Sequence, residues 1–199
     1  MRYEKKRVLV VGMARSGVAA AQLLLHHGAT PVLYDAKTAE AFGEELHPLY
    51  GTACEFHLGE DPFALLESCD AVVISPGVPI DAPLVRAAKE RGLSLVGELE
   101  LAYSLLMGEV LAISGTNGKT TTVTLLGKMF ENAGRITYVA GNIGYPLSSV
   151  ALSSKKRDVI VTEVSSFQLE SIKTFHPRVA ALLNITEDHL NRHGTMEQY

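Results

Sequence analysis

Residues 112–122 read AISGTNGKTTT and have the form of a phosphate-binding loop that opens a helix. Gly118, Lys119 and Thr120 supply the Gly-Lys-Thr end of that pattern. The loop is shorter than usual, because Ile113 stands where the pattern has its first glycine. A short apolar run precedes the loop and a helical pattern follows it, which is the context that a phosphate loop requires.

The residue types in this loop predict a site for the phosphates of ATP. Its two glycines leave backbone N–H groups free to surround phosphate oxygens, and the following helix directs its positive end toward them. Lys119 supplies a positive charge for the terminal phosphates, and Thr120 supplies a hydroxyl for Mg²⁺. The predicted ATP-binding residues are Gly115, Thr116, Asn117, Gly118, Lys119, Thr120 and Thr121.

The composition is that of an ordinary folded protein. The 199 residues are 47% hydrophobic and 20% charged, and this length allows one large domain or one domain with part of another. A net charge of −4 with scattered basic residues favours no nucleic-acid partner. Cys54 and Cys69 fit neither a zinc nor a redox spacing and indicate a reducing compartment. We find no apolar run of about 18 residues, so we expect no membrane span and a cytoplasmic location.

Strand-like and helix-like segments alternate along the chain. The predicted strands are residues 7–11, 31–34, 54–58, 71–74, 93–96, 110–113, 136–140, 159–163 and 179–185. The predicted helices are residues 16–27, 81–91 with Asp81 as its cap, 98–106, 119–132, and a last one that begins at residue 194. This alternation predicts an α/β fold with parallel sheets covered by helices. We expect two units, residues 1–95 and residues 96–199.

The first unit opens with VLVVGMARSGVAAAQLLL, which has the strand–turn–helix form of a dinucleotide-binding fingerprint. Gly12 is expected to make the tight turn, and Gly17 to let the helix pack closely on the strand. Ala14 replaces the middle glycine that normally admits a pyrophosphate. These residues are compatible with three interpretations: a site for a nicotinamide cofactor, a site for another nucleotide, or a purely structural turn.

Polar residues beside this turn favour a phosphate ligand. Arg15 and Ser16 can donate to phosphate oxygens at a helix N-terminus. Asp35 stands at the tip of the second strand, where a ribose-binding acid is expected. Ser75 and Gly77 belong to the SPGVP turn after another strand, at the edge where α/β sheets place ligand loops.

Two segments of the second unit carry further candidate residues. Glu163 ends the strand in VIVTEVSSFQLE and suits a Mg²⁺ ligand or a water-holding group beside the loop. His189 and His193 lie four apart in NITEDHLNRH, a spacing that suggests zinc on a helix, but the HExxH pattern is absent. We expect a loop there, with Asp188 and His189 facing a second metal or the reacting groups.

Together these segments resemble the ATP-dependent Mur ligases of bacterial peptidoglycan synthesis. GTNGKTT is similar to their shortened phosphate loop, TEVSSFQLE to their glutamate segment and NITEDHLNRHG to their histidine segment. AGNIGYP, which contains Asn142, resembles a further stretch of the family. VVGMARSGVAAAQLL, ISPGVPIDAPLVRAA and GLSLVGELELA resemble the branch of the family that adds D-glutamate.

The resemblance implies a Rossmann-like first domain, residues 1–95, that binds UDP rather than a dinucleotide. Residues 96–199 would be part of a P-loop ATPase-type domain, without the C-terminal domain that brings the amino acid. The implied reaction joins D-glutamate to UDP-N-acetylmuramoyl-L-alanine through an acyl phosphate, with ATP and Mg²⁺, for cell-wall synthesis. The full-length protein is expected to be a cytoplasmic monomer.

The resemblance also implies residue roles. The substrate-binding residues would be Arg15, Ser16, Asp35, Lys37, Ser75, Gly77, Asn142 and His189. The catalytic residues would be Lys119, Glu163 and His189. Thr120 and Glu163 would hold one Mg²⁺, and His189 would bind a second.

Some features leave alternatives open. The carbamylated lysine of the family would lie beyond Tyr199, so we expect the 199-residue chain to be inactive alone. Another Mur ligase or a folylpolyglutamate-type ligase has a similar loop. A nicotinamide-dependent oxidoreductase and a regulatory ATPase are alternatives from other classes.

Overall fold

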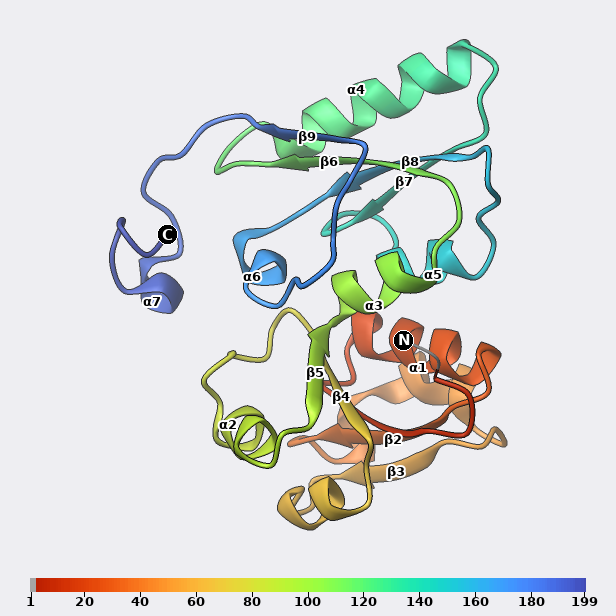
Figure 1. Ribbon diagram of the computed structural model, residues 1–199, viewed down its shortest axis with the longest axis vertical. Helices are drawn as coiled ribbons and strands as arrows, with labels where there is room; N and C mark the ends of the chain where they lie inside the picture. Colours follow the sequence, from red (N-terminus) through yellow and green to blue (C-terminus); the bar gives the residue numbers. More distant parts are fainter. Residues whose placement is uncertain (1–2) are drawn as a thin grey trace.

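The computed structural model describes residues 3–199, which form two parallel sheets, one from each half of the chain (Figure 1). The first sheet has five strands in the order β3-β2-β1-β4-β5. The second has four strands in the order β7-β8-β6-β9. Every strand pair that forms them is parallel, which confirms the predicted α/β class.

The first sheet reverses its strand order at β1, where the site of an open α/β sheet is expected. Its strands are β1 (Arg7–Val11), β2 (Thr30–Asp35), β3 (Glu55–Leu58), β4 (Ala71–Ile74) and β5 (Ser94–Gly97). Its helices are α1 (Arg15–His26) and α2 (Pro83–Glu90), with the 3-10 turns η1 (Ala39–Ala41), η2 (Gly43–Leu49) and η3 (Phe63–Glu67). Ligand crevices of such sheets lie beyond the carboxyl ends of the strands at this reversal. The turns that follow β1 and β4 therefore meet at one edge.

Alternating side chains of β1 bury both faces of this sheet. Val8 and Val10 belong to the cluster that contains α1, whereas Leu9 and Val11 belong to the cluster that contains α2. A strand covered on both faces reads as a continuous apolar run, which explains RVLVV at residues 7–11. Each such buried side chain contributes about 1.5–3 kcal/mol.

The second sheet is also parallel, and it is formed by the second half of the chain. Its strands are β6 (Glu109–Ser114), β7 (Thr137–Gly141), β8 (Val159–Glu163) and β9 (Val179–Leu182). The helices are α3 (Glu98–Leu105), α4 (Lys119–Asn132), α5 (Leu147–Ala151), α6 (Ser166–Leu169) and α7 (Leu190–His193). Figure 1 shows α4 over the outer face, while α1, α3 and α5 lie between the two sheets. One apolar cluster includes residues of α1, α3 and α5, so the two halves share a core.

Four local expectations were wrong. The segment NITEDHLNRH, expected to be a loop, contains the short helix α7 over Leu190–His193. The helix expected from residue 81 begins at Pro83, and its N-cap is Ala82 without a side-chain cap, because proline takes the first helical position. The strand expected over residues 179–185 ends at Leu182, where the chain leaves the sheet toward the phosphate loop. Residues from 194 onward form bends and turns instead of a helix.

Within residues 3–199, none of the helices has the length and apolar character needed to cross a membrane.

Candidate active site

The predicted phosphate loop joins β6 to α4 and depends on its two glycines. Gly115 has φ 135° and Gly118 has φ 85°, which are conformations that favour glycine. A Cβ on Gly115 would lie 3.1 Å from the carbonyl oxygen of Asn184, so the segment after β9 comes close to the loop. Gly118 is the N-cap of α4, and the loop therefore ends at the positive end of a 14-residue helix.

Lys119 folds back over the loop that precedes it. Its Nζ donates to the carbonyl oxygens of Gly115 at 2.7 Å and Thr116 at 2.9 Å. A lysine ammonium has three N–H donors, and these two carbonyls take two of them. These two bonds hold the positive charge of Lys119 against the backbone of the loop. Thr121, the last of the predicted ATP-binding residues, lies exposed in the first turn of α4.

Glu163 is a buried carboxylate that connects the loop to the segment after β7. It is 3% exposed, and its Oε2 accepts a hydrogen bond of 2.7 Å from Thr120 Oγ1. Its Oε1 accepts one of 3.1 Å from Asn142 Nδ2, and its backbone oxygen accepts one of 2.9 Å from Asn142 N. A Cβ on Gly141 would lie 2.2 Å from that backbone oxygen, so the approach of the two strands requires glycine there. The structure thus brings three predicted site residues into direct contact.

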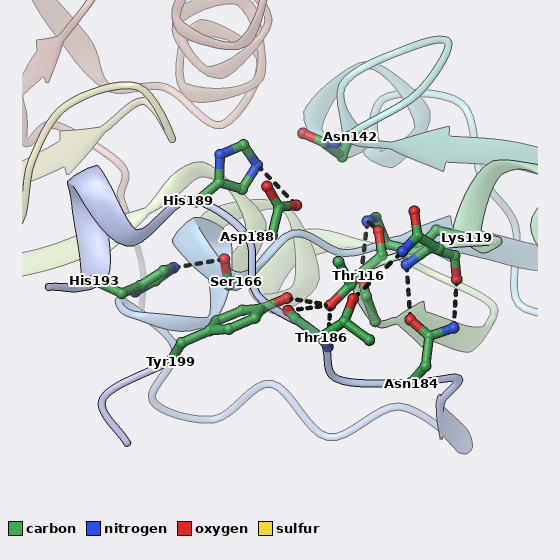
Figure 2. A network of polar contacts seen from close by, with 12 residues as sticks. Thr116, Lys119, Asn142, Ser166, Asn184, Thr186, Asp188, His189, His193 and Tyr199 are labelled. Atoms are coloured by element: carbon green, nitrogen blue, oxygen red, sulfur yellow. Dashed lines mark hydrogen bonds and ion pairs between the residues drawn. The ribbon is translucent and has the colours of Figure 1, made fainter. Parts of the chain in front are cut away.

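The segment after β9 holds the loop through contacts that sequence reasoning missed (Figure 2). Asn184 Oδ1 accepts from Asn117 N at 2.9 Å, and Asn184 Nδ2 donates to Asn117 O at 2.9 Å. Thr116 Oγ1 accepts from Thr186 N at 2.9 Å and lies 2.9 Å from the hydroxyl of Tyr199. The available signal was the polar Asn184 near the carboxyl end of the predicted strand 179–185, since polar residues at that edge of a parallel sheet meet the loops of its neighbours.

His189 lies at the N-cap of α7 and Asp188 lies beside it. The His189 side chain is 52% exposed, and its Nε2 is 3.5 Å from Asp188 Oδ2. Its ring centroid is 4.9 Å from that of Phe167. Figure 2 shows His189 and Asp188 next to one another, with Asn142 across from them.

His193 has other partners and does not form a metal pair with His189. Its Nε2 lies 2.9 Å from Ser166 Oγ, and its ring stacks on Tyr199 with centroids 5.1 Å apart. Across residues 3–199, no group of three or more His, Cys, Asp or Glu side chains is arranged to hold a metal ion. The structure therefore does not support a zinc site formed by His189 and His193.

A cavity of about 190 Å³ brings the predicted residues of the second half together. It is lined by Ser114, Gly115, Lys119, Asn142, Ser165, Ser166, Leu169, Leu182, Ile185, Asp188, His189 and Tyr199. Lys119 and His189, which are 70 positions apart in sequence, thus face one space.

A larger cleft of about 500 Å³ lies between the two halves. It is lined by Gly12, Ala14, Arg15, Ser16, Asp35, Lys37, Ser75, Pro76, Gly77, Val78, Gly141, Asn142, Gly144, Pro146 and Gln168. Every predicted substrate residue except His189 is in this set. Asn142 lines both the cleft and the 190 Å³ cavity, so the two spaces adjoin at this residue.

Contacts among the cleft residues fix the turn after β1. Gly12 has φ 90°, and its carbonyl oxygen accepts a hydrogen bond of 2.7 Å from Ser75 Oγ. A Cβ on Gly17 would lie 1.9 Å from the same carbonyl oxygen, which confirms the predicted close packing of helix and strand. The carboxylate of Asp35 accepts from the backbone N–H groups of Met13 at 2.8 Å and Lys37 at 3.0 Å. Asp35 therefore also orders the loops around the cleft.

Arg15 links the two halves across this cleft. Its guanidinium donates to the carbonyl oxygen of Gly144, in the segment between β7 and α5. This arginine follows the turn after β1 and begins α1. Its side chain thus spans the space where a ligand at the α1 N-terminus would lie.

Two buried glutamates at the start of α3 were not predicted. Burial raises the pKa of Glu98, although its Oε1 accepts a 2.7 Å hydrogen bond from Ser148 N that acts in the opposite direction. Burial also acts to raise the pKa of Glu100, but hydrogen bonds from residues 173–175 outweigh it, so that pKa is lowered. The donors are the N–H groups of Lys173, Thr174 and Phe175 and the hydroxyl of Thr174. The signal was the ELEL pattern, which places acids in an apolar helix.

Comparisons with known proteins identify the domains that the two halves of the chain resemble. Residues 6–97 match the Mur ligase MurD-like N-terminal domain, and residues 113–199 match the Mur ligase middle domain. The UDP-N-acetylmuramoylalanine--D-glutamate ligase of Caldanaerobacter subterraneus subsp. tengcongensis is 49% identical over 199 residues, which are 100% of this chain and 44% of that protein. The ligase of the same name from Alkaliphilus metalliredigens is 48% identical over 201 residues, again 100% of this chain and 44% of that protein.

A solved structure supports the fold. The UDP-N-acetylmuramate:L-alanyl-gamma-D-glutamyl-meso-diaminopimelate ligase of Neisseria meningitides matches with a TM-score of 0.60 at 22% identity. The match covers 94% of this chain and 63% of that one. The chain spans 44% of the length of the curated relatives described above. It belongs to the Mur ligase family, with a MurD-like N-terminal domain followed by middle-domain sequence.

Proposed function

We propose that this chain provides the UDP-substrate cleft and the ATP-phosphate site of a UDP-N-acetylmuramoyl-L-alanine:D-glutamate ligase. The observation that carries the proposal is the position of Asn142, which lines both the 500 Å³ cleft and the 190 Å³ cavity. A long substrate in the cleft can therefore bring its terminal carboxylate to the phosphate loop. We infer the identity of the substrate from the names of the relatives that are 48% and 49% identical.

The first half would bind the UDP portion. Arg15, Ser16 and Lys37 line the cleft and supply donors for phosphate and uridine oxygens. The N-terminus of α1 adds backbone N–H groups at the same place. Asp35 and Ser75 shape the surrounding turns through the contacts described above.

The second half would activate the substrate carboxylate. The γ-phosphoryl group of ATP passes to the terminal carboxylate of L-alanine, which gives an acyl phosphate and ADP. The amine of D-glutamate then attacks the acyl carbon, and phosphate leaves. Lys119 would stabilise the negative charge of the transferred group, which is mainly an electrostatic task. Asn142 would orient the substrate arm at the junction.

The residues around Thr120 fit the Mg²⁺ that such a reaction uses. Thr120 and Glu163 present a hydroxyl and a buried carboxylate within 2.7 Å of each other, and hard cations prefer such oxygen ligands. Mg²⁺ bound there would neutralise phosphate charge. His189 and Asp188 line the same cavity as Lys119, which supports His189 as the ligand of a second Mg²⁺.

Other properties remain predictions. We place the division between the two domains at residues 95 and 96, in β5. We also propose a cytoplasmic location and a monomeric full-length protein.

The deciding experiment measures ADP release by the full-length protein that contains this chain. Mg-ATP and UDP-N-acetylmuramoyl-L-alanine are supplied with D-glutamate, without it, or with L-glutamate, L-alanine or L-lysine. We expect turnover only with D-glutamate. Turnover with another amine, or none with any, would overturn the proposed activity.

A matched pair of lysine variants tests the phosphate site. Lys119→Ala should abolish ADP release, because it removes the charge at the loop. Lys128→Ala is the control, since Lys128 lies on the same helix and pairs with Glu131 at the surface. Equal activity of the two variants would contradict the assignment of Lys119.

A further inference from the structure

The short helix α7 needs support from outside itself. It has four residues, and helices of that length are not stable alone. Arg192 provides this support by donating to Glu170, from Nε to Oε1 at 3.2 Å and from Nη2 to Oε2 at 2.6 Å. The two side chains are 15% and 20% exposed, so solvent screens this pair only weakly.

The ring of Phe167 organises the same residues. The Arg192 guanidinium carbon lies 4.9 Å from the ring centroid, and the His189 ring lies at the same distance from it. Phe167 belongs to α6, and Glu170 follows this helix as its C-cap. Arg192 therefore binds α7 to α6 through both charge and ring contacts.

Arg192 also reaches the first half of the molecule. Its Nη2 donates to the carbonyl oxygen of Val78 at 3.2 Å, over a separation of 114 positions. Val78 lies in the loop Ser75–Pro79, and it lines the 500 Å³ cleft together with Pro76 and Gly77. One guanidinium on α7 thus contacts both the Ser75–Pro79 loop and the α6 segment with Phe167 and Glu170.

His189 depends on this helix for its position. Its backbone has φ 51°, a left-handed conformation that is unfavourable for a residue with a Cβ. Its carbonyl oxygen accepts from Arg192 N at 2.8 Å and from His193 N at 3.1 Å. The unfavourable backbone is retained because the following turn is anchored, by the Arg192 side chain on Glu170 and by the His193 ring on Ser166.

We propose that Arg192 is a positioning residue, which sets the His189 side chain in the cavity and ties it to the Ser75–Pro79 loop. The role of His189 in catalysis rests on the function proposed above, whereas its dependence on Arg192 does not. Lysine is a poor substitute at this position, because a single ammonium lacks the planar fork that pairs with Glu170 while reaching Val78.

The first test uses the 199-residue chain without ligand and observes it by NMR. Arg192→Lys and Glu170→Gln should shift the His189 ring-proton resonances, which the Phe167 ring perturbs. Arg192→Lys should also shift the amide resonances of Gly77 and Val78. Unchanged resonances at His189 and Val78 in folded variants would overturn the proposal.

Arg91→Ala is the matched control for this experiment. Arg91 also donates to a backbone carbonyl, that of Phe63 at 3.1 Å, and lies 4.0 Å from the Glu67 carboxylate. Both partners belong to the first half of the chain. The resonances of His189 and Val78 should stay in place in this variant.

The second test uses the full-length protein. Arg192→Lys should lower kcat by about 10- to 100-fold and raise the Mg²⁺ concentration for half-maximal activity, as changes beside metal ligands do. The KM for ATP should change little, because Arg192 does not contact the phosphate loop. A lower Tm with unchanged kcat and Mg²⁺ dependence would reduce Arg192 to a structural role. If wild type lacks D-glutamate-dependent ADP release, the proposed activity fails, and the NMR test still decides the role of Arg192.

Discussion

Thr120 Oγ1 donates a hydrogen bond of 2.7 Å to Glu163 Oε2, and this contact joins the start of α4 to the end of β8. The two residues are 43 positions apart, and they meet because β6 and β8 are parallel neighbours. The carboxyl ends of neighbouring parallel strands lie at one edge, so the residues that follow them can share a ligand. The hydroxyl and the carboxylate therefore define the place where we propose Mg²⁺.

Glu163→Gln tests this relationship with little change in size. The amide keeps the side-chain volume but removes the negative charge, so the Mg²⁺-dependent part of ATP-analogue affinity should fall at least about tenfold, or ~1.4 kcal/mol. Calorimetric titration of the chain with a non-hydrolysable ATP analogue, in Mg²⁺ and in EDTA, measures it. Glu131→Gln is the control, because Glu131 lies exposed near the C-terminal end of α4, far along the helix from Thr120. The same loss in EDTA would argue against a metal role for Glu163.

The phosphate loop was predictable because its signals are local. Gly118, Lys119 and Thr120 are consecutive, and the strand and helix that flank them have their own periodicity. The same holds for Gly12 and Gly17, whose spacing alone predicts a turn and a close helix contact. In each case the information lies within about ten residues.

The contacts of Asn184 and Arg192 were not predictable in this way. Asn184 reaches Asn117 because β9 lies next to β6, and the strand order β7-β8-β6-β9 is not written in any local pattern. Arg192 meets Val78 only because the two sheets pack as they do. Sequence reasoning found the residues that follow strands but not the partners that tertiary structure gives them.

Gly17→Ala should destabilise the first half. Its Cβ would lie 1.9 Å from the carbonyl oxygen of Gly12 and 3.0 Å from the carbonyl carbon, and both are backbone atoms of a fixed turn. Overpacking of this kind costs about 1–3 kcal/mol or more. Urea unfolding of the chain measures the loss. Gly77→Ala is the control for stability, since a Cβ there has open space, and an equal loss in both variants would contradict the explanation.

Glu98→Gln should change how stability depends on pH. Burial raises the pKa of Glu98 above its usual 4.5. Below that value both states hold the proton, and above it the unfolded chain releases a proton that the folded chain keeps. The free energy of unfolding therefore falls as pH rises from about 4.5 to the folded-state pKa.

The glutamine of Glu98→Gln cannot ionise, so the free energy of unfolding of this variant should lack the part of the decline that Glu98 causes. Urea unfolding of wild type and variant at pH 5 and pH 8 measures the difference between their slopes. Glu44→Gln replaces an exposed glutamate and serves as the control. A wild-type decline that persists unchanged in Glu98→Gln would show that other groups cause it.

Asn184 variants separate the shape of the phosphate loop from its charge. Asn184→Ala removes both 2.9 Å hydrogen bonds to Asn117 and should weaken binding of an ATP analogue by about 1–3 kcal/mol. Asn184→Asp keeps an acceptor for Asn117 N, loses the donor to Asn117 O, and adds a negative charge beside the phosphates. Asn184→Asp should bind the ATP analogue more weakly than Asn184→Ala at low salt. The difference in affinity between the two variants should narrow at high salt, because exposed charges are screened. Titrations with the ATP analogue at low and high salt check this prediction.

Asn132→Asp, at the far end of α4, is the control for the added charge. Wild-type affinity in Asn184→Ala would mean that the loop holds its shape without Asn184. A difference in affinity between the two Asn184 variants that does not depend on salt would mean that the added charge does not act through space.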